Sequence, residues 1–120
     1  MFSEWEERDI GLGAVIVAIG GKLRGSRARQ LGELLSEMPM RRDPITRIVL
    51  DLRDVVTIDS LGTAAIEEAH EGGLEIALVA RAGLELDDGR PAKALSRRGL
   101  SVHTNVDAAI SSLRIPVTVS

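Results

Sequence analysis

Two adjacent polar residues, Asp59 and Ser60, stand where the surrounding residues predict the end of a strand and the start of a helix. The segment 48–52 is apolar apart from Asp51, as in a buried strand, and residues 61–69 are mostly good helix formers. The first N–H groups of a helix lack partners within the helix, so a side chain there meets free backbone donors. The Ser60 hydroxyl could therefore cap the helix, attack a substrate or receive a phosphate.

A hydrolase is weakly supported. The G-x-S-x-G nucleophile elbow is only half present around Ser60, because Ile58 replaces its first glycine. Ser60, then Asp87 or Asp88, then His103 follow the chain order of a hydrolase triad, but 120 residues are about half of what such a sheet needs. We therefore do not expect an enzyme.

A receiver-type phospho-acceptor at Asp51 is also weakly supported. Such domains need an acidic pair after the first strand, whereas this chain has the glycine-rich segment 20–26, which lacks the P-loop order as well. Asp51, Asp54 and Asp59 could form a metal cluster, but acids in a strand-to-helix turn are more often caps and turn formers. No metal or cofactor is predicted.

The composition limits the class of protein. The chain is 44% hydrophobic and 28% charged and has no apolar run approaching the roughly 20 residues of a membrane span. Its N-terminus lacks the features of a signal peptide, and it contains no cysteine. A net charge of -3, with one Trp, one Phe and no Tyr, argues against direct nucleic-acid binding. We expect a single cytoplasmic domain over residues 1–120, without a membrane span.

The periodicities predict an α/β domain in the order β-β-α-β-α-β-α-β-α. The first two strands are joined by a short glycine link and should form an antiparallel hairpin, while strands that alternate with helices should be parallel. The predicted strands are 5–10, 14–19, 45–52, 74–79 and 101–103. About four helices are expected, over 26–38, 60–71, 91–98 and 105–113, followed by a loosely held tail at 115–120. The second helix should turn Leu61, Ala65 and Ala69 inward.

The segment Val56-Thr57-Ile58-Asp59-Ser60-Leu61-Gly62, followed by an alanine-rich helix, resembles the signature of STAS domains, which in soluble form are anti-sigma factor antagonists. The resemblance extends over nearly the whole chain. It includes Gly21-Lys22-Leu23 after the second strand, the strand at 74–79, and Gly99-Leu100 before residues 106–110.

The resemblance implies a STAS-like mixed sheet and a regulatory switch in the stress response. An anti-sigma factor with serine kinase activity would hold a sigma factor, and the unphosphorylated antagonist would bind the anti-sigma factor and release the sigma factor. The kinase would phosphorylate Ser60 and end the binding, and a serine phosphatase would reset it. Thr63 is a weaker acceptor candidate or a plain solvent-facing residue. The alternative is a STAS accessory or scaffold module of a transporter or stress-signalling complex, without a phosphoswitch.

Elementary electrostatics agrees with a switch at Ser60. A phosphate adds about -1.5 to -2 charges, which a free helix N-terminus accommodates. Against a packed partner the same charge would be buried beside Asp59. Moving a bound fraction from 99:1 to 1:99 takes roughly 5.5 kcal/mol, and a buried, uncompensated anion can supply several of these. The alternative is that Ser60 is only an N-cap, worth about 1 kcal/mol.

The binding surface is expected to centre on the Asp54–Asp59 turn, the exposed side of the following helix and the loop at Arg24. Its residues are Arg24, Asp54, Thr57, Asp59, Ser60, Leu61, Gly62 and Thr63. The chain departs from the family pattern in two places. Many members have Gly-x-Leu-Asp where this chain has Arg24 in the last position, and the loop 80–90 looks longer and could be partner-specific.

Overall fold

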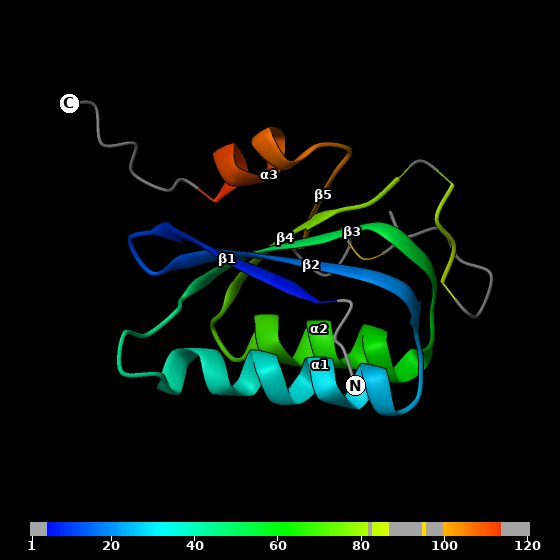
Figure 1. The fold of residues 1–120 in the computed structure, drawn as a ribbon, viewed down its shortest axis with the longest axis horizontal. Helices are drawn as coiled ribbons and strands as arrows, with labels where there is room; N and C mark the ends of the chain where they lie inside the picture. The colour runs from blue at the N-terminus through cyan, green and yellow to red at the C-terminus, as the bar shows by residue number, and fades with distance from the viewer. Residues whose placement is uncertain (1–4, 82, 87–94, 96–99, 114–120) are drawn as a thin grey trace.

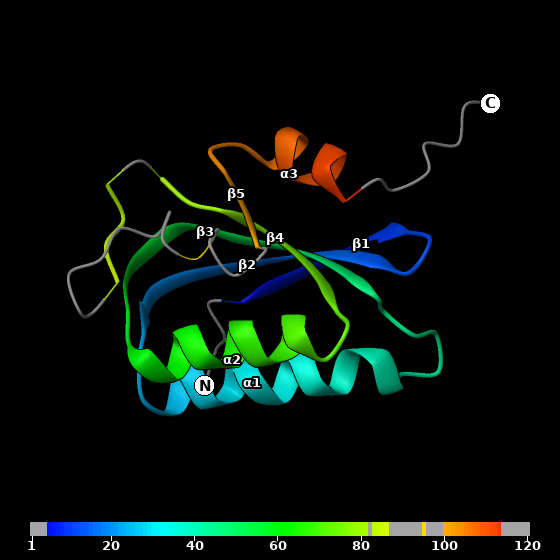
Figure 2. The same ribbon diagram turned by 180° about the vertical axis from the view of Figure 1, so that it is seen from behind.

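The protein folds around a five-stranded sheet with helices on both faces (Figures 1 and 2). The computed structural model describes residues 5–81, 83–86, 95 and 100–113. The strands lie in chain order: β1 (Glu6–Gly11), β2 (Ala14–Leu23), β3 (Arg47–Ile58), β4 (Glu75–Val79) and β5 (Ser101–His103). β1 is antiparallel to β2 and all other neighbours are parallel, which confirms the predicted mixed sheet.

Two cores hold the layers together. α1 (Ser26–Glu37) and α2 (Ser60–Glu71) lie side by side on one face, and α3 (Val106–Ser112) covers the other (Figure 1). The larger core lies under α1 and α2 and includes Leu31, Leu50 and Ile66. The smaller one joins Val49 and Val79 to Ala109 of α3. Because strands buried on both faces read as continuous apolar runs, β3 and β4 were recognisable from the sequence.

β2 and β3 are longer than predicted. Residues 20–23, expected to be a glycine-rich loop, pair with residues 54–58, expected to be a turn. The register shifts twice, between Ala18 and Gly20 and between Gly21 and Lys22, so β3 carries extra residues on this side. Such bulges bend a strand, and the ends of β2 and β3 curve toward the beginnings of α1 and α2 (Figure 1).

The described part of the chain contains three α-helices, not the four expected, together with a short 3₁₀ turn, η1 (Met38–Met40). The predicted helix at 91–98 lies outside the described residues except for Leu95, which is buried. The predicted tail at 115–120 also lies outside them. In the 80–90 segment, Leu84 and Leu86 are buried, and Leu86 forms a bridge with Ile58.

α2 has the predicted bounds but a different buried face. Gly62, Thr63 and Ile66 are buried, whereas Leu61, expected to point inward, is 50% exposed. The reason is tertiary: Gly62 packs on Ile58 and Leu23 at the ends of β3 and β2, so the helix face that carries residues 62, 63 and 66 meets the sheet. None of the described helices is both long and apolar enough to cross a membrane.

Candidate functional site

Asp59 organises the junction of β3 and α2. Its Oδ1 accepts a hydrogen bond from the Gly62 N–H at 2.9 Å, and its Oδ2 accepts one from the Gly25 N–H, also at 2.9 Å. Its own N–H donates to the Leu23 carbonyl at 3.2 Å. One carboxylate therefore caps α2 and ties the loop between β2 and α1 to it.

Ser60 is thus not the cap. It is the first residue of α2 and is exposed, while Asp59 has taken the capping role that the sequence left open to Ser60. Ser60 therefore lies in the first turn of the helix, whose unpaired N–H groups carry partial positive charge.

Gly62 allows this junction to be close. A Cβ at this position would lie 2.8 Å from Ile58 Cγ2 and 3.3 Å from the Leu23 carbonyl oxygen. The glycine of the Asp-Ser-x-Gly pattern is therefore required by packing, because the first turn of α2 rests directly on the ends of β2 and β3.

The charge of Asp59 is stabilised at this position. Burial raises the pKa of Asp59, but the hydrogen bonds from Gly25 and Gly62, with the positive charge of Arg24, outweigh it. The net pKa lies below the ordinary value of 3.8. Because its pKa is lower in the folded state than in the unfolded chain, ionised Asp59 stabilises the fold at pH values above the unfolded-state pKa. This stabilisation is lost as the pH falls through the folded-state pKa.

We expect Asp59→Ala to lower the free energy of unfolding by about 1–2 kcal/mol at neutral pH, the usual cost of losing an N-cap. Asp59→Asn should lose less, since its single amide oxygen can still accept one of the two hydrogen bonds. Urea unfolding at several pH values measures both. The difference between wild type and Asp59→Asn should shrink as the pH falls below the ordinary pKa of 3.8 and through the lower pKa of folded Asp59.

Asp54→Asn is the matched control for Asp59→Asn, because Asp54 is an exposed acid on β3, the strand that ends just before Asp59. A loss of stability as large in the control, or a pH-independent difference at Asp59, would contradict the capping role.

The bulged end of β2 is held by Arg27, a residue that the sequence did not single out. Its guanidinium donates to the carbonyl oxygens of Gly20 at 2.7 Å and Lys22 at 2.8 Å, and it lies over the Trp5 ring with 5.9 Å to the centroid. This clamp fixes the strand that leads into the Arg24 loop. No local sequence pattern predicts this role of Arg27, because its hydrogen-bond acceptors are backbone atoms.

The remaining predicted residues fall into two groups. Arg24 is exposed and lies close enough for its charge to act on Asp59, and Thr57 is half-buried near the end of β3. Asp54 is exposed opposite Gly20, up to about 16 Å of strand away from Asp59. Asp54 is therefore the predicted residue that the fold sets apart.

Thr63 is buried, so the interpretation of Thr63 as a solvent-facing residue is wrong. It is 6% exposed, and its hydroxyl donates to the Asp59 carbonyl at 3.2 Å. A kinase could reach this hydroxyl only after the first turn of α2 had opened.

The described residues do not form the hydrolase triad, the Asp51 phospho-acceptor site or the metal cluster that the sequence left as alternatives. His103 pairs with Val79, which packs under α3, so its side chain points to the face opposite α2 and Ser60. Asp87 and Asp88 lie outside the described residues. Asp51 accepts hydrogen bonds from Arg53 at 2.9 and 2.7 Å, and among the described residues no cluster of three potential ligands could hold a metal ion.

A groove between α1 and α2 was not predicted from the sequence. It begins at Leu61 and is lined by small side chains. Small residues recur at positions 28, 32 and 36 of α1, a spacing that marks one helix face. That spacing does not show which neighbour the face meets.

Comparison with known proteins places the fold. No family model matches the chain, and no curated protein matches it in sequence. An anti-sigma factor antagonist from Mycobacterium paratuberculosis superposes with a TM-score of 0.71 at 18% identity, over 92% of this chain and 93% of that one. The chain thus has the STAS-like fold of anti-sigma factor antagonists, as the resemblance implied.

Two further structures have the same fold. The anti-sigma factor antagonist SpoIIAA in its unphosphorylated form has a TM-score of 0.65 at 15% identity, covering 92% of this chain and 97% of that one. A variant of RsbS from Moorella thermoacetica, in which a serine is replaced by glutamate, has a TM-score of 0.63 at 19% identity, covering 93% and 96%.

Proposed function

We propose that this protein is an anti-sigma factor antagonist whose binding to a kinase-type anti-sigma factor is ended by phosphorylation of Ser60. The observation that carries the proposal is the exposed Ser60 hydroxyl at the start of α2, with the neighbouring Asp59 doing the capping. Ser60 can therefore be modified without the loss of a structural hydrogen bond. Similar folds belong to anti-sigma factor antagonists, one of them described in an unphosphorylated form, which supports the proposal.

The local charges give the switch its direction. In the free domain a phosphate on Ser60 would meet water, the first N–H groups of α2 and the charge of Arg24, all of which favour an anion. Under a bound partner the water would be excluded, and the phosphate would lie beside the Asp59 carboxylate. Phosphorylation is thus tolerated by the fold and opposes the complex.

The direct test is phosphorylation of the full chain. The protein is incubated with ATP and each kinase-type anti-sigma factor of the source organism, and its intact mass and modified residue are determined. We expect a single phosphate on Ser60 and none on Ser60→Ala. Modification elsewhere would overturn the proposal. Stable binding that is indifferent to Ser60 would overturn it in favour of a scaffold module.

Arg24 should act on the phosphate itself. In the singly phosphorylated protein we expect Arg24→Gln to raise the second pKa of the phosphate by roughly 0.2–0.7, because an exposed ion pair is worth about 0.3–1 kcal/mol. A ³¹P NMR titration measures this change. Lys22→Gln is the matched control, since Lys22 is also an exposed cation but is paired with Thr57 on β3. Equal shifts in both variants would show that only net charge matters.

A further inference from the structure

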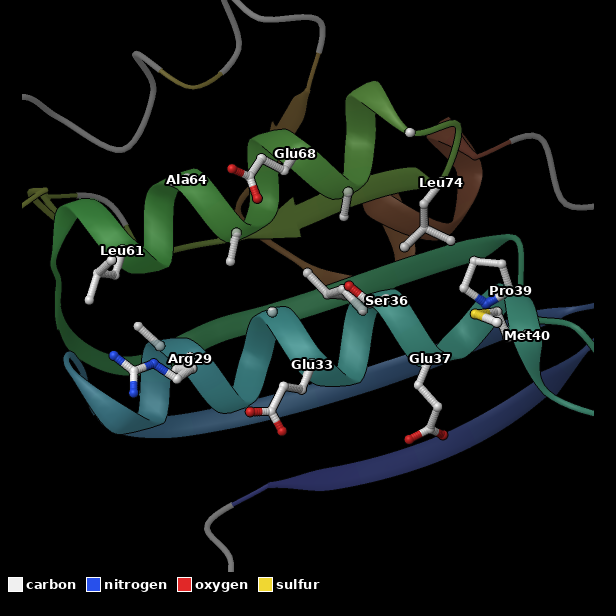
Figure 3. A pocket seen from close by; sticks show the side chains of 16 residues that line it. Arg29, Glu33, Ser36, Glu37, Pro39, Met40, Leu61, Ala64, Glu68 and Leu74 are labelled. Atoms are coloured by element: carbon white, nitrogen blue, oxygen red, sulfur yellow. The ribbon is translucent and has the colours of Figure 1, made fainter.

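An apolar groove of about 1000 Å³ runs between α1 and α2 on the outer side of the helical layer (Figure 3). Leu61 stands at one end, 50% exposed, and Met40 at the other, 84% exposed. The apolar lining between them joins these two side chains into one surface, and a continuous exposed apolar surface is typical of an interaction site. From Ala28 to Met40 the wall formed by α1 and η1 is about 18 Å long, or about three helical turns.

The groove exists because small residues line both helices. Ala28, Gly32 and Ser36 on α1 face Ala64, Ala65 and Ala69 on α2. A Cβ on Gly32 would lie only 3.5 Å from the Ala65 Cβ, so the helices approach closely there. Short side chains cannot cover the outer side of such a close contact, and the space that longer ones would occupy stays open.

The rim of the groove is acidic. Glu33 on α1 and Glu68 on α2 line opposite walls, and within the described part of the chain neither carboxylate has an ion-pair partner. Glu37 is also at the rim but is paired with Arg41 at 2.7 Å. Arg29 is the basic residue of the lining. A ligand of this groove would meet an apolar floor between two uncompensated negative charges.

We propose that the groove binds an amphipathic helix of a partner protein, about three turns long, with apolar side chains in the groove and basic side chains beside Glu33 and Glu68. In helix-in-groove recognition the bound helix carries an apolar stripe, which fits the apolar floor of this groove. Basic residues beside the stripe would match the acidic residues on its two walls. A second copy of this chain fits less well, because a symmetric dimer would bring two acidic rims together.

This proposal does not rest on the phosphoswitch at Ser60. The groove begins at Leu61, next to the switch residue, but its walls and charges extend away from it toward Met40. The groove can therefore be tested on the unmodified protein without an anti-sigma factor.

The test uses two synthetic peptides of about four helical turns with the same leucine stripe, one flanked by lysines and the other by glutamates. Each is titrated into the ¹⁵N-labelled full chain, and NMR follows amides including Gly32 and Ala65. We expect the lysine peptide to bind at least about tenfold more tightly, with shifts confined to the groove. Glu68→Lys should weaken its binding about fivefold. Ser36→Arg should also weaken binding of the lysine peptide, because the longer side chain would fill the exposed side of the groove.

Glu71→Lys is the matched control. Glu71 is an exposed acid on α2 that does not line the groove, so this variant should bind the lysine peptide like wild type. An equal loss in Glu71→Lys, equal binding of both peptides, or shifts outside the groove would overturn the proposal. Shifts of the groove amides that grow with protein concentration in the absence of peptide would overturn it in favour of a second copy.

Discussion

Ser60→Asp should weaken binding to a kinase-type anti-sigma factor by about 30- to 1000-fold, while Ser60→Ala should bind within a few fold of wild type. The expected cost is roughly 2–4 kcal/mol, the range for a buried charge without a partner. Asp carries one charge where phosphate carries up to two, so the full effect of phosphorylation should be larger. Isothermal titration calorimetry with the purified anti-sigma factor measures both variants.

The folded state should not account for this loss of binding. A carboxylate in the first turn of α2 interacts favourably with the helix dipole, so Ser60→Asp should unfold at the same temperature as wild type or slightly higher. Ser111→Asp is the matched control, because Ser111 is an exposed serine on α3, across the sheet from Ser60. Equal binding by Ser60→Asp and Ser60→Ala, or an equal loss in the control, would refute the switch.

Gly62→Ala should destabilise the domain by about 1–3 kcal/mol, the usual cost of forcing extra volume into a close-packed site. The new methyl would lie 2.8 Å from Ile58 Cγ2 and 3.3 Å from the Leu23 carbonyl oxygen, so either the first turn of α2 or the strand end must move. That movement would also loosen the hydrogen bond from Gly62 to Asp59. Urea unfolding gives the change in free energy.

Gly32→Ala is the matched control for Gly62→Ala, because both glycines are helical and both face a neighbouring element. A Cβ on Gly32 would meet Ala65 at an ordinary 3.5 Å. Since Ala is favoured over Gly in a helix interior, this variant should be neutral or more stable by up to about 1 kcal/mol. If Gly62→Ala were equally harmless, close packing would not explain the glycine of the Asp-Ser-x-Gly pattern.

The helices and central strands were predictable where one local rule dominates. The apolar runs of β3 and β4 and the bounds of α2 appear as predicted, because each depends on neighbours in sequence. The extensions of β2 and β3 were not predicted. Residues 20–23 and 54–58 look like loop and turn alone, and they become strand because they pair with each other across a doubly shifted register.

The sequence by itself determined the five strands and the three helices of the described residues, because hydrophobic period and turn chemistry are local, and its resemblance to STAS domains marked Asp59, Ser60 and Gly62 as the residues of interest. The tertiary structure alone decided how these residues divide the work. Asp59 caps α2 through one oxygen and holds Gly25 of another loop through the second. Gly62 is needed because two strand ends pack against it, and Ser60 is left exposed. The α1–α2 groove likewise depends on two faces that meet only in the folded chain.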